Sequence, residues 1–191
     1  ERDQVRLRIA FSSNDGNAGT TTVFDGFAFD NFFVGEKKRN VLVEHFTTNV
    51  NQVADNYLNN LYQSQFTPLR TASDFYNIQY HVNFATGDQL NFDNPIDPEA
   101  RSLYYGVSQP PYSIMDGLLV PGKFTGVTTE LTSAEIDRRA LLDPQFDLQL
   151  DTIATNNSRT ISVRLNLTAR QAVDEPILVQ VALLEDNVVV G

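Results

Sequence analysis

The sequence predicts an α/β central domain between two all-β segments. Strand and helix patterns alternate over residues 40–142, as expected for a layered α/β fold. Residues 1–35 and 145–191 instead alternate apolar and polar side chains with a period of two, which is typical of half-buried strands. The expected parts of the chain are residues 1–37, 38–143 and 144–191.

The N-terminal part is predicted to be strand, loop and strand. Apolar residues alternate with polar ones over Val5–Phe11, a polar loop follows, and an aromatic strand is expected over Phe24–Val34. The aromatic run resembles the last strand of concanavalin-like jelly-roll domains, which implies that residues 1–37 are the C-terminal strands of such a domain. Asp30 and Asn31 then either bind calcium or cap backbone groups in a turn, and the capping role is favoured.

The central part opens with Glu36–Arg39, a charged stretch that is expected to be an exposed linker. The apolar residues Val41–Val43 indicate a central strand over 40–46, because a strand covered on both faces needs apolar side chains in both directions. Apolar residues spaced three and four apart over Val50–Leu61 predict a helix, and alternation over 75–84 predicts a second core strand.

The second half of the central part starts with a predicted loop over 85–97, which is rich in Asn, Asp, Gly and Pro. A short helix is expected from Pro98 to Tyr105, with Asp97 as its N-cap. The strand Tyr112–Met115 should then end in a tight turn at Asp116–Gly117 and continue as a hairpin through Leu118–Val120.

A last helix of the central part is predicted from its N-terminal capping pattern. Thr132 and Glu135 have the spacing of a capping box, and the helix should run to about Leu142, where Pro144 stops it. Beyond this helix, three strand patterns look like the first half of a β-sandwich. They are residues 146–154, 160–169 and 177–186.

Both ends of the sequence fall within apolar strand patterns, whereas the termini of globular proteins are usually polar and exposed. The sequence is therefore expected to be a fragment of a longer protein, whose other domains would be partners of this one. Asp151-Thr152-Ile153 also fits a short O-glycosylation sequence of surface proteins in related bacteria, a match that chance explains equally well.

Five short motifs resemble, in order, the thioredoxin-like outer-membrane protein family named for a twenty-eight-kilodalton member. The resemblance covers about residues 38–185 and implies a thioredoxin-like domain followed by an immunoglobulin-like β-sandwich. The matching residues are Glu44, Phe46, Thr47, Tyr80-His81, Arg101, Tyr104-Tyr105-Gly106, Pro111 and Asp116-Gly117.

The chain departs from this family at the redox centre. By the resemblance, the two thiol positions fall at Asn51 and Ala54, and the chain contains no cysteine. A thiolate is the nucleophile of thiol–disulfide exchange, so the usual reaction of the fold cannot occur. Pro111 matches the family's proline beside the redox site, and a cis peptide bond is expected there.

Composition excludes several classes of partner. The formal charge of −10 argues against nucleic-acid backbones and against anionic lipid surfaces, both of which attract clustered Lys and Arg. No apolar run approaches the roughly 20 residues of a spanning helix, so no direct membrane span is expected.

Candidate catalytic or metal-binding residues are few. His45 and His81 lie on predicted neighbouring strands, but two histidines without further ligands make a poor zinc site, so structural hydrogen bonding is favoured. The stretch Asp88–Asp97 offers oxygens for calcium without the regular spacing of a calcium loop, so a solvated loop is favoured. No cofactor is expected, with calcium as the open alternative.

These observations favour a non-catalytic, thioredoxin-like interaction module of a larger bacterial cell-surface or outer-membrane-associated protein. The resemblance implies an outer-membrane protein complex that serves secretion, motility or nutrient uptake. The alternative is a carbohydrate- or peptide-binding module that uses the aromatic strand at 24–34, and an enzyme is disfavoured. The residues expected to contact a partner are Thr48, Asn49, Val50, Gln52 and Tyr112.

Overall fold

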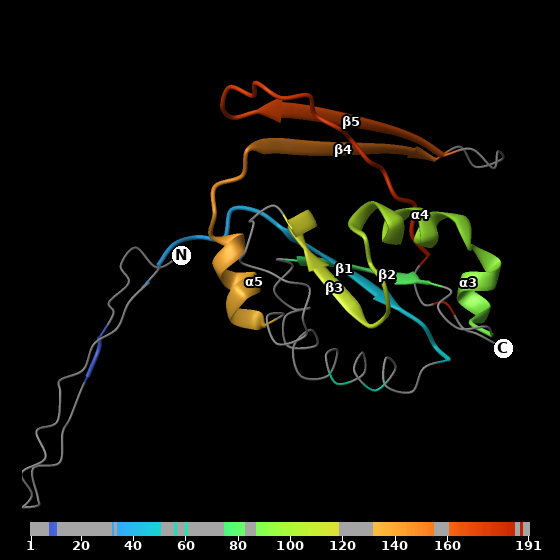
Figure 1. The fold of residues 1–191 in the computed structure, drawn as a ribbon. Helices are drawn as coiled ribbons and strands as arrows, with labels where there is room; N and C mark the ends of the chain where they lie inside the picture. The colour runs from blue at the N-terminus through green and yellow to red at the C-terminus, as the bar shows by residue number, and fades with distance from the viewer. Residues whose placement is uncertain are drawn as a thin grey trace, which may run out of the picture. The chain divides into compact units, whose positions relative to one another are not determined.

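The chain divides into two compact units, Glu1–Val34 and Gly35–Gly191. The computed structural model describes residues 8–10, 32, 34–50, 56, 60, 75–82, 87–118, 132–154, 161–185 and 188 (Figure 1). The predicted jelly-roll strands, with Asp30 and Asn31, therefore lie outside the described residues except for a few positions.

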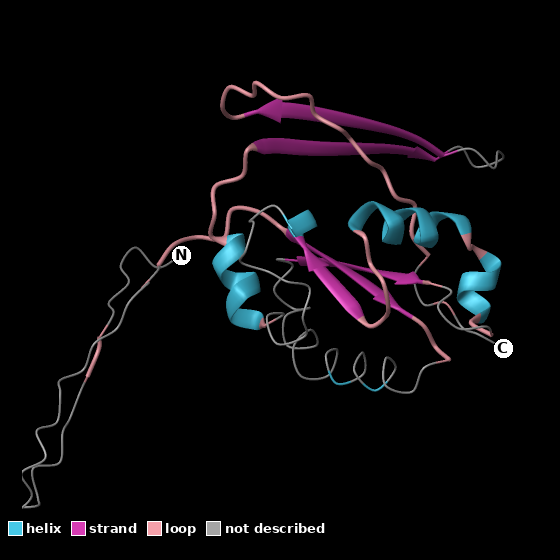
Figure 2. Ribbon diagram, viewed as in Figure 1, coloured by secondary structure: helices cyan, strands magenta, loops and turns pink. Residues whose placement is uncertain are grey.

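A three-stranded sheet forms the centre of the second unit. Strand β1 (Val41–Thr47) lies between β2 (Phe75–His81) and β3 (Tyr112–Met115). β1 pairs with β2 in parallel and with β3 antiparallel. All three strands were predicted close to these bounds, and the second unit mixes helices and strands as an α/β fold does (Figure 2).

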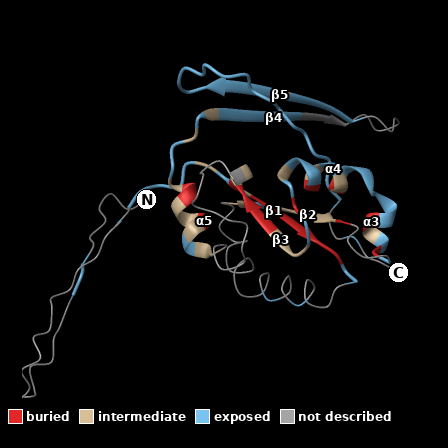
Figure 3. Ribbon diagram, in the orientation of Figure 1, coloured by how far each residue is buried: buried red, intermediate tan, exposed pale blue. Residues whose placement is uncertain are grey.

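The buried core of the sheet is centred on β1, because β1 is the middle strand. Val41 and Val43 are fully buried on one side of this strand and Phe46 on the other, because successive side chains point to opposite faces. Phe46 packs in an apolar cluster with Val82, Val107 and Ile114, joined by three half-buried tyrosines. Figure 3 shows β1 and β3 as the buried part of the sheet.

Two helices replace the loop that was predicted over 85–97. Helix α3 (Gln89–Asp93) has Asp88 as its N-cap, whose carboxylate accepts from the backbone N–H groups of Leu90 and Asn91. The loop prediction was wrong because the polar composition concealed a side-chain cap. Helix α4 (Ile96–Tyr105) begins earlier than predicted, with Pro95 rather than Asp97 at its N-cap.

The ends of the other elements show the expected local chemistry. Helix α4 ends at Gly106, whose φ of 66° is the left-handed conformation that glycine adopts without strain. Helix α5 (Ser133–Ala140) starts at Thr132, whose hydroxyl accepts from the Glu135 N–H at 3.2 Å, so the predicted cap is present. The helix ends two residues before the predicted Leu142.

The C-terminal strands β4 (Phe146–Ala154) and β5 (Ile161–Ala169) form an antiparallel hairpin. Leu148 pairs with Leu167 and Leu150 with Leu165, so one face of the hairpin is apolar. The third strand predicted at 177–186 is absent from residues 177–185, which have no strand partner. Alternation alone does not make a strand when no neighbouring edge accepts its hydrogen bonds.

Within the described part of the chain, no helix is both long and apolar enough to cross a membrane.

Candidate functional site

The described residues that were expected to contact a partner lie together at one end of the three-stranded sheet. Because β1 and β2 are parallel, both strands end there, and the antiparallel β3 begins beside them with Tyr112 opposite Phe46. The segment Thr48–Val50 therefore follows β1 at the same end of the sheet as Pro111. The Pro110–Pro111 bond is cis, the isomer expected from the sequence.

The residues at this end differ in their access to solvent. Asn49 and Val50 are exposed and Tyr112 is half-buried. Thr48 is only 1% exposed, and its hydroxyl faces the Val50 N–H at 3.5 Å, so its side chain is not part of the surface that was predicted to include it. Asn51, Gln52 and Ala54 lie outside the described residues.

Asp88 fixes the backbone around this end. Its carboxylate accepts from the Asn49 N–H at 2.9 Å, lies 2.9 Å from His81 Nδ1, and caps α3. Burial opposes ionisation of Asp88, but the hydrogen bonds from His81, Asn49 and Asn91 together lower its pKa below the ordinary value. An ionised, buried carboxylate thus ties the segment after β1 to β2 and α3.

His45 lies on the opposite face of β1 from Phe46 and is fully buried. Its Nδ1 is 2.6 Å from the Ser113 hydroxyl. Burial, with a smaller contribution from nearby His81, lowers the pKa of His45 to about 4, so the imidazole is neutral at pH 7. The two histidines have different partners, and no cluster of three potential metal ligands occurs among the described residues.

Glu44 is the centre of a buried polar network between β1, β2 and α4. Its side chain is 1% exposed and accepts four hydrogen bonds. Arg101 donates two of them, from Nε to Oε1 at 2.6 Å and from Nη2 to Oε2 at 3.0 Å. The hydroxyls of Tyr80 and Tyr105 donate the others, at 3.1 and 2.6 Å. A buried carboxylate of this kind is tolerated because it is paired and hydrogen-bonded.

Aromatic rings surround this network. Phe46 stacks on Tyr80 with 5.1 Å between ring centres, and the Arg101 guanidinium carbon lies 4.6 Å from the centre of the Tyr105 ring. Burial, reinforced by the Glu44 carboxylate, raises the pKa of Tyr80 to about 12 and that of Tyr105 further. Both hydroxyls therefore remain protonated donors, and neither is available as a base at neutral pH.

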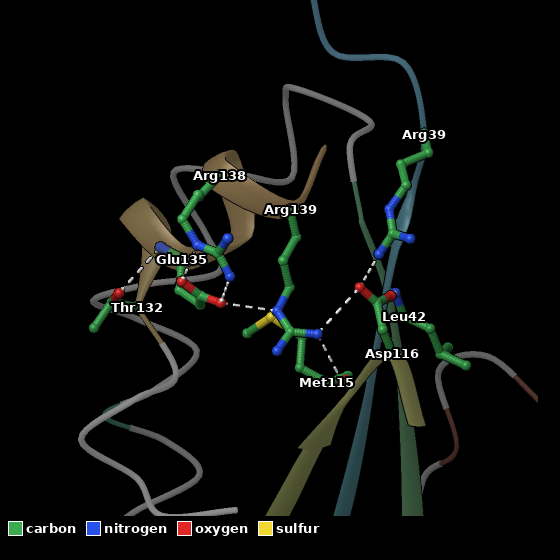
Figure 4. Close-up of polar contacts among 8 residues, drawn as sticks. All are labelled: Arg39, Leu42, Met115, Asp116, Thr132, Glu135, Arg138 and Arg139. Carbon is green, nitrogen blue, oxygen red and sulfur yellow. Dashed lines mark hydrogen bonds and ion pairs between the residues drawn. The ribbon is translucent and has the colours of Figure 1, made fainter. Parts of the chain in front are cut away.

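A second charged cluster lies at the other end of β1, around the Asp116–Gly117 turn (Figure 4). Asp116 has a φ of 51°, and its carboxylate accepts from the Leu42 N–H at 3.0 Å and pairs with Arg39 and Arg139. Arg139 is 1% exposed and also donates to the Met115 carbonyl at 3.1 Å. The hairpin turn predicted at Asp116–Gly117 is instead a short 3-10 helix over Asp116–Leu118, so Leu118 does not continue the strand. The pairs with Arg39 and Arg139 hold this segment on both sides.

The stretch Glu36–Arg39 was predicted to be an exposed linker, and Glu36, Lys37 and Lys38 are exposed, but its cations also make ion pairs that were not predicted. Lys37 pairs with Asp137 at 2.8 Å, Lys38 with Asp143 at 2.6 Å, and Arg39 with Asp116. The Lys38 N–H also donates to the Ala140 carbonyl at 2.8 Å. Each of these three cations pairs with an acidic residue far along the chain, which the local composition does not reveal.

Sequence reasoning overlooked the roles of Glu44 and Asp88. A charged residue within the apolar run Val41–Phe46 was the available signal, because a charge on a central strand requires a partner. Five residues of the matched motifs belong to one network. Tyr80, Arg101 and Tyr105 donate hydrogen bonds to Glu44, and Phe46 stacks on Tyr80.

Comparison with protein-family models, curated proteins and solved structures finds no match.

Proposed function

We propose that the chain is a non-catalytic, thioredoxin-like interaction module, whose contact surface is the end of the sheet around Val50 and Tyr112. The observation that carries the proposal is the register of the sheet, which puts the segment after β1 beside the start of β3. In open α/β sheets, the carboxyl ends of parallel strands are where ligands and partners commonly bind.

The chemistry of the site favours binding over catalysis. The chain has no thiol, the neutral His45 is buried, and the hydroxyls of Tyr80 and Tyr105 are held protonated. Glu44 is occupied by four internal hydrogen bonds. The polar groups of the sheet therefore stabilise its shape, while Asn49 and Val50 remain accessible.

The wider setting of the proposal rests on the sequence resemblance. A larger bacterial cell-surface or outer-membrane-associated protein would carry this module between other domains, within an envelope assembly for secretion, motility or nutrient uptake. The C-terminal hairpin, with its apolar face, would belong to an immunoglobulin-like sandwich.

Site-specific photo-crosslinking in the native host tests this surface. A benzophenone amino acid at Val50, which is 41% exposed, should give adducts with a partner or a neighbouring domain. The matched control is the same amino acid at Tyr76 on β2, which is 64% exposed and outside the proposed surface. Adducts that form equally at both positions, or only at Tyr76, would contradict the proposal.

A further inference from the structure

Helix α4 presents an apolar stripe to solvent. Ile96, Ala100 and Tyr104 follow one another at intervals of four residues, and Leu103 lies beside them, so that all four share one side of the helix. All four are exposed, Ile96 at 75% and Leu103 at 79%. The opposite side of the helix faces the core through Arg101. An ordinary surface helix has the reverse arrangement, with its apolar stripe against the core.

The chain that passes beside α4 leaves this stripe uncovered. Residues 177–184 reach the helix at Gln180, whose side-chain oxygen accepts from Arg101 Nη1, and Figure 1 shows the segment beside the helix. Leu178 and Leu183 of this segment are themselves exposed. The segment therefore adds exposed apolar side chains near the stripe and does not cover it. An apolar surface left exposed in this way is typical of an interaction site.

Acidic residues border the stripe on both sides. An α-helix turns by about 100° per residue, so Asp97 and Glu99 fall on opposite flanks of the stripe. Arg101 is the only basic residue of α4, and its guanidinium is paired with a buried carboxylate. The segment beside the helix is bordered by Glu175 and Glu185, which are exposed. The surface thus combines an apolar centre with a negative border.

This chemistry favours one kind of occupant. The backbone groups inside a helix are bonded within it, so an extended peptide finds no edge to pair with and only side-chain packing remains. A ridge of residues four apart packs into the groove of another helix, and the small Ala100 in the middle of the ridge allows close approach. The negative border favours basic residues on that helix. A second copy of this chain, with its formal charge of −10, and an anionic lipid surface would both be repelled.

We propose that the exposed stripe of α4 is a docking surface for a basic amphipathic helix of a partner protein. The apolar side of that helix packs on the ridge, and its flanking Lys or Arg side chains face the acidic border. The stripe shares no residue with the proposed contact surface around Val50 and Tyr112, so either surface can fail its test without the other.

Calorimetric titration with a synthetic peptide tests this proposal. The probe is a peptide of Leu and Lys, about 18 residues long so that it forms a helix, with its leucines on one side. The matched control peptide has the same composition in scrambled order. The ordered peptide should bind the full chain about ten-fold more tightly, because it alone presents an apolar stripe to α4. Equal binding of the two peptides would reveal attraction to the net negative charge alone and would overturn the proposal.

Variants of the chain locate the binding on α4. Leu103→Ser should weaken binding of the ordered peptide about ten-fold, whereas Leu148→Ser on the hairpin, where the leucine is 67% exposed, should leave it unchanged. Both leucines are exposed, so neither substitution should unfold the chain. Unchanged binding in Leu103→Ser, or an equal loss in Leu148→Ser, would overturn the proposal. Self-association of the chain alone that Leu103→Ser abolishes in sedimentation would also overturn it, by assigning the stripe to a second copy.

Discussion

The Glu44–Arg101 pair gives the strongest test of how the sheet and α4 are held together. Glu44 is buried and accepts four hydrogen bonds, and the Arg101 side chain is 19% exposed. Glu44→Gln keeps the shape of the side chain, but it removes the charge and turns an amide donor toward the donors that surround it. Arg101→Met removes the cation and leaves the carboxylate with the two tyrosine hydroxyls.

Each single substitution should lower the free energy of unfolding by about 3 kcal/mol, since breaking a buried pair leaves the other charge poorly compensated. The double variant should lose only about 4 kcal/mol, which gives a coupling energy of about 2 kcal/mol for two residues in one network. The assay is urea unfolding followed by circular dichroism.

The control for this cycle is the exposed pair of Asp147 and Arg170 on the hairpin, at 2.5 Å. Arg170→Met should leave the unfolding midpoint unchanged, because solvent screens an exposed ion pair. If Glu44→Gln is as stable as the wild-type chain, or if the two single costs simply add, the network does not hold α4 on the sheet.

Two further predictions concern pH and helix capping. His45 has a pKa of about 4 in the folded chain against about 6.5 when unfolded, so between these values the unfolded chain binds more protons and stability falls as pH falls. The loss from this group should reach about 3 kcal/mol between pH 7 and pH 4, measured by urea unfolding at each pH, and a slope that persists unchanged in His45→Asn would refute this assignment. Thr132→Ala should lower the free energy of unfolding by about 1 kcal/mol through loss of the α5 cap, and a thermal unfolding curve that matches the wild-type chain would show that the cap contributes nothing.

The sequence predicted those elements whose signals are local. The apolar run at Val41–Val43, the alternation after Phe75 and the Thr132–Glu135 spacing each act within a few residues, and the corresponding elements are present. The Asp88 cap was also local, but the surrounding Asn, Asp, Gly and Pro favoured a loop.

Long-range pairing could not be predicted in the same way. Arg101 is 57 residues from Glu44, and Arg39 is 77 residues from Asp116, so no window of sequence contains both members of either pair. The segment 177–185 shows the converse case, because its strand pattern is clear while strand formation depends on a neighbouring edge that the described chain does not supply. Contacts of this kind depend on the complete fold.

We propose above that the chain keeps a thioredoxin-like shape without the thiols of the usual reaction of that fold. Introducing two cysteines tests this proposal, in an insulin-reduction assay with dithiothreitol. We expect the wild-type chain to be inactive, and Asn51→Cys/Ala54→Cys to form an internal disulfide and to accelerate insulin reduction. Activity in the wild-type chain, or a restored pair that stays reduced and inactive, would contradict it.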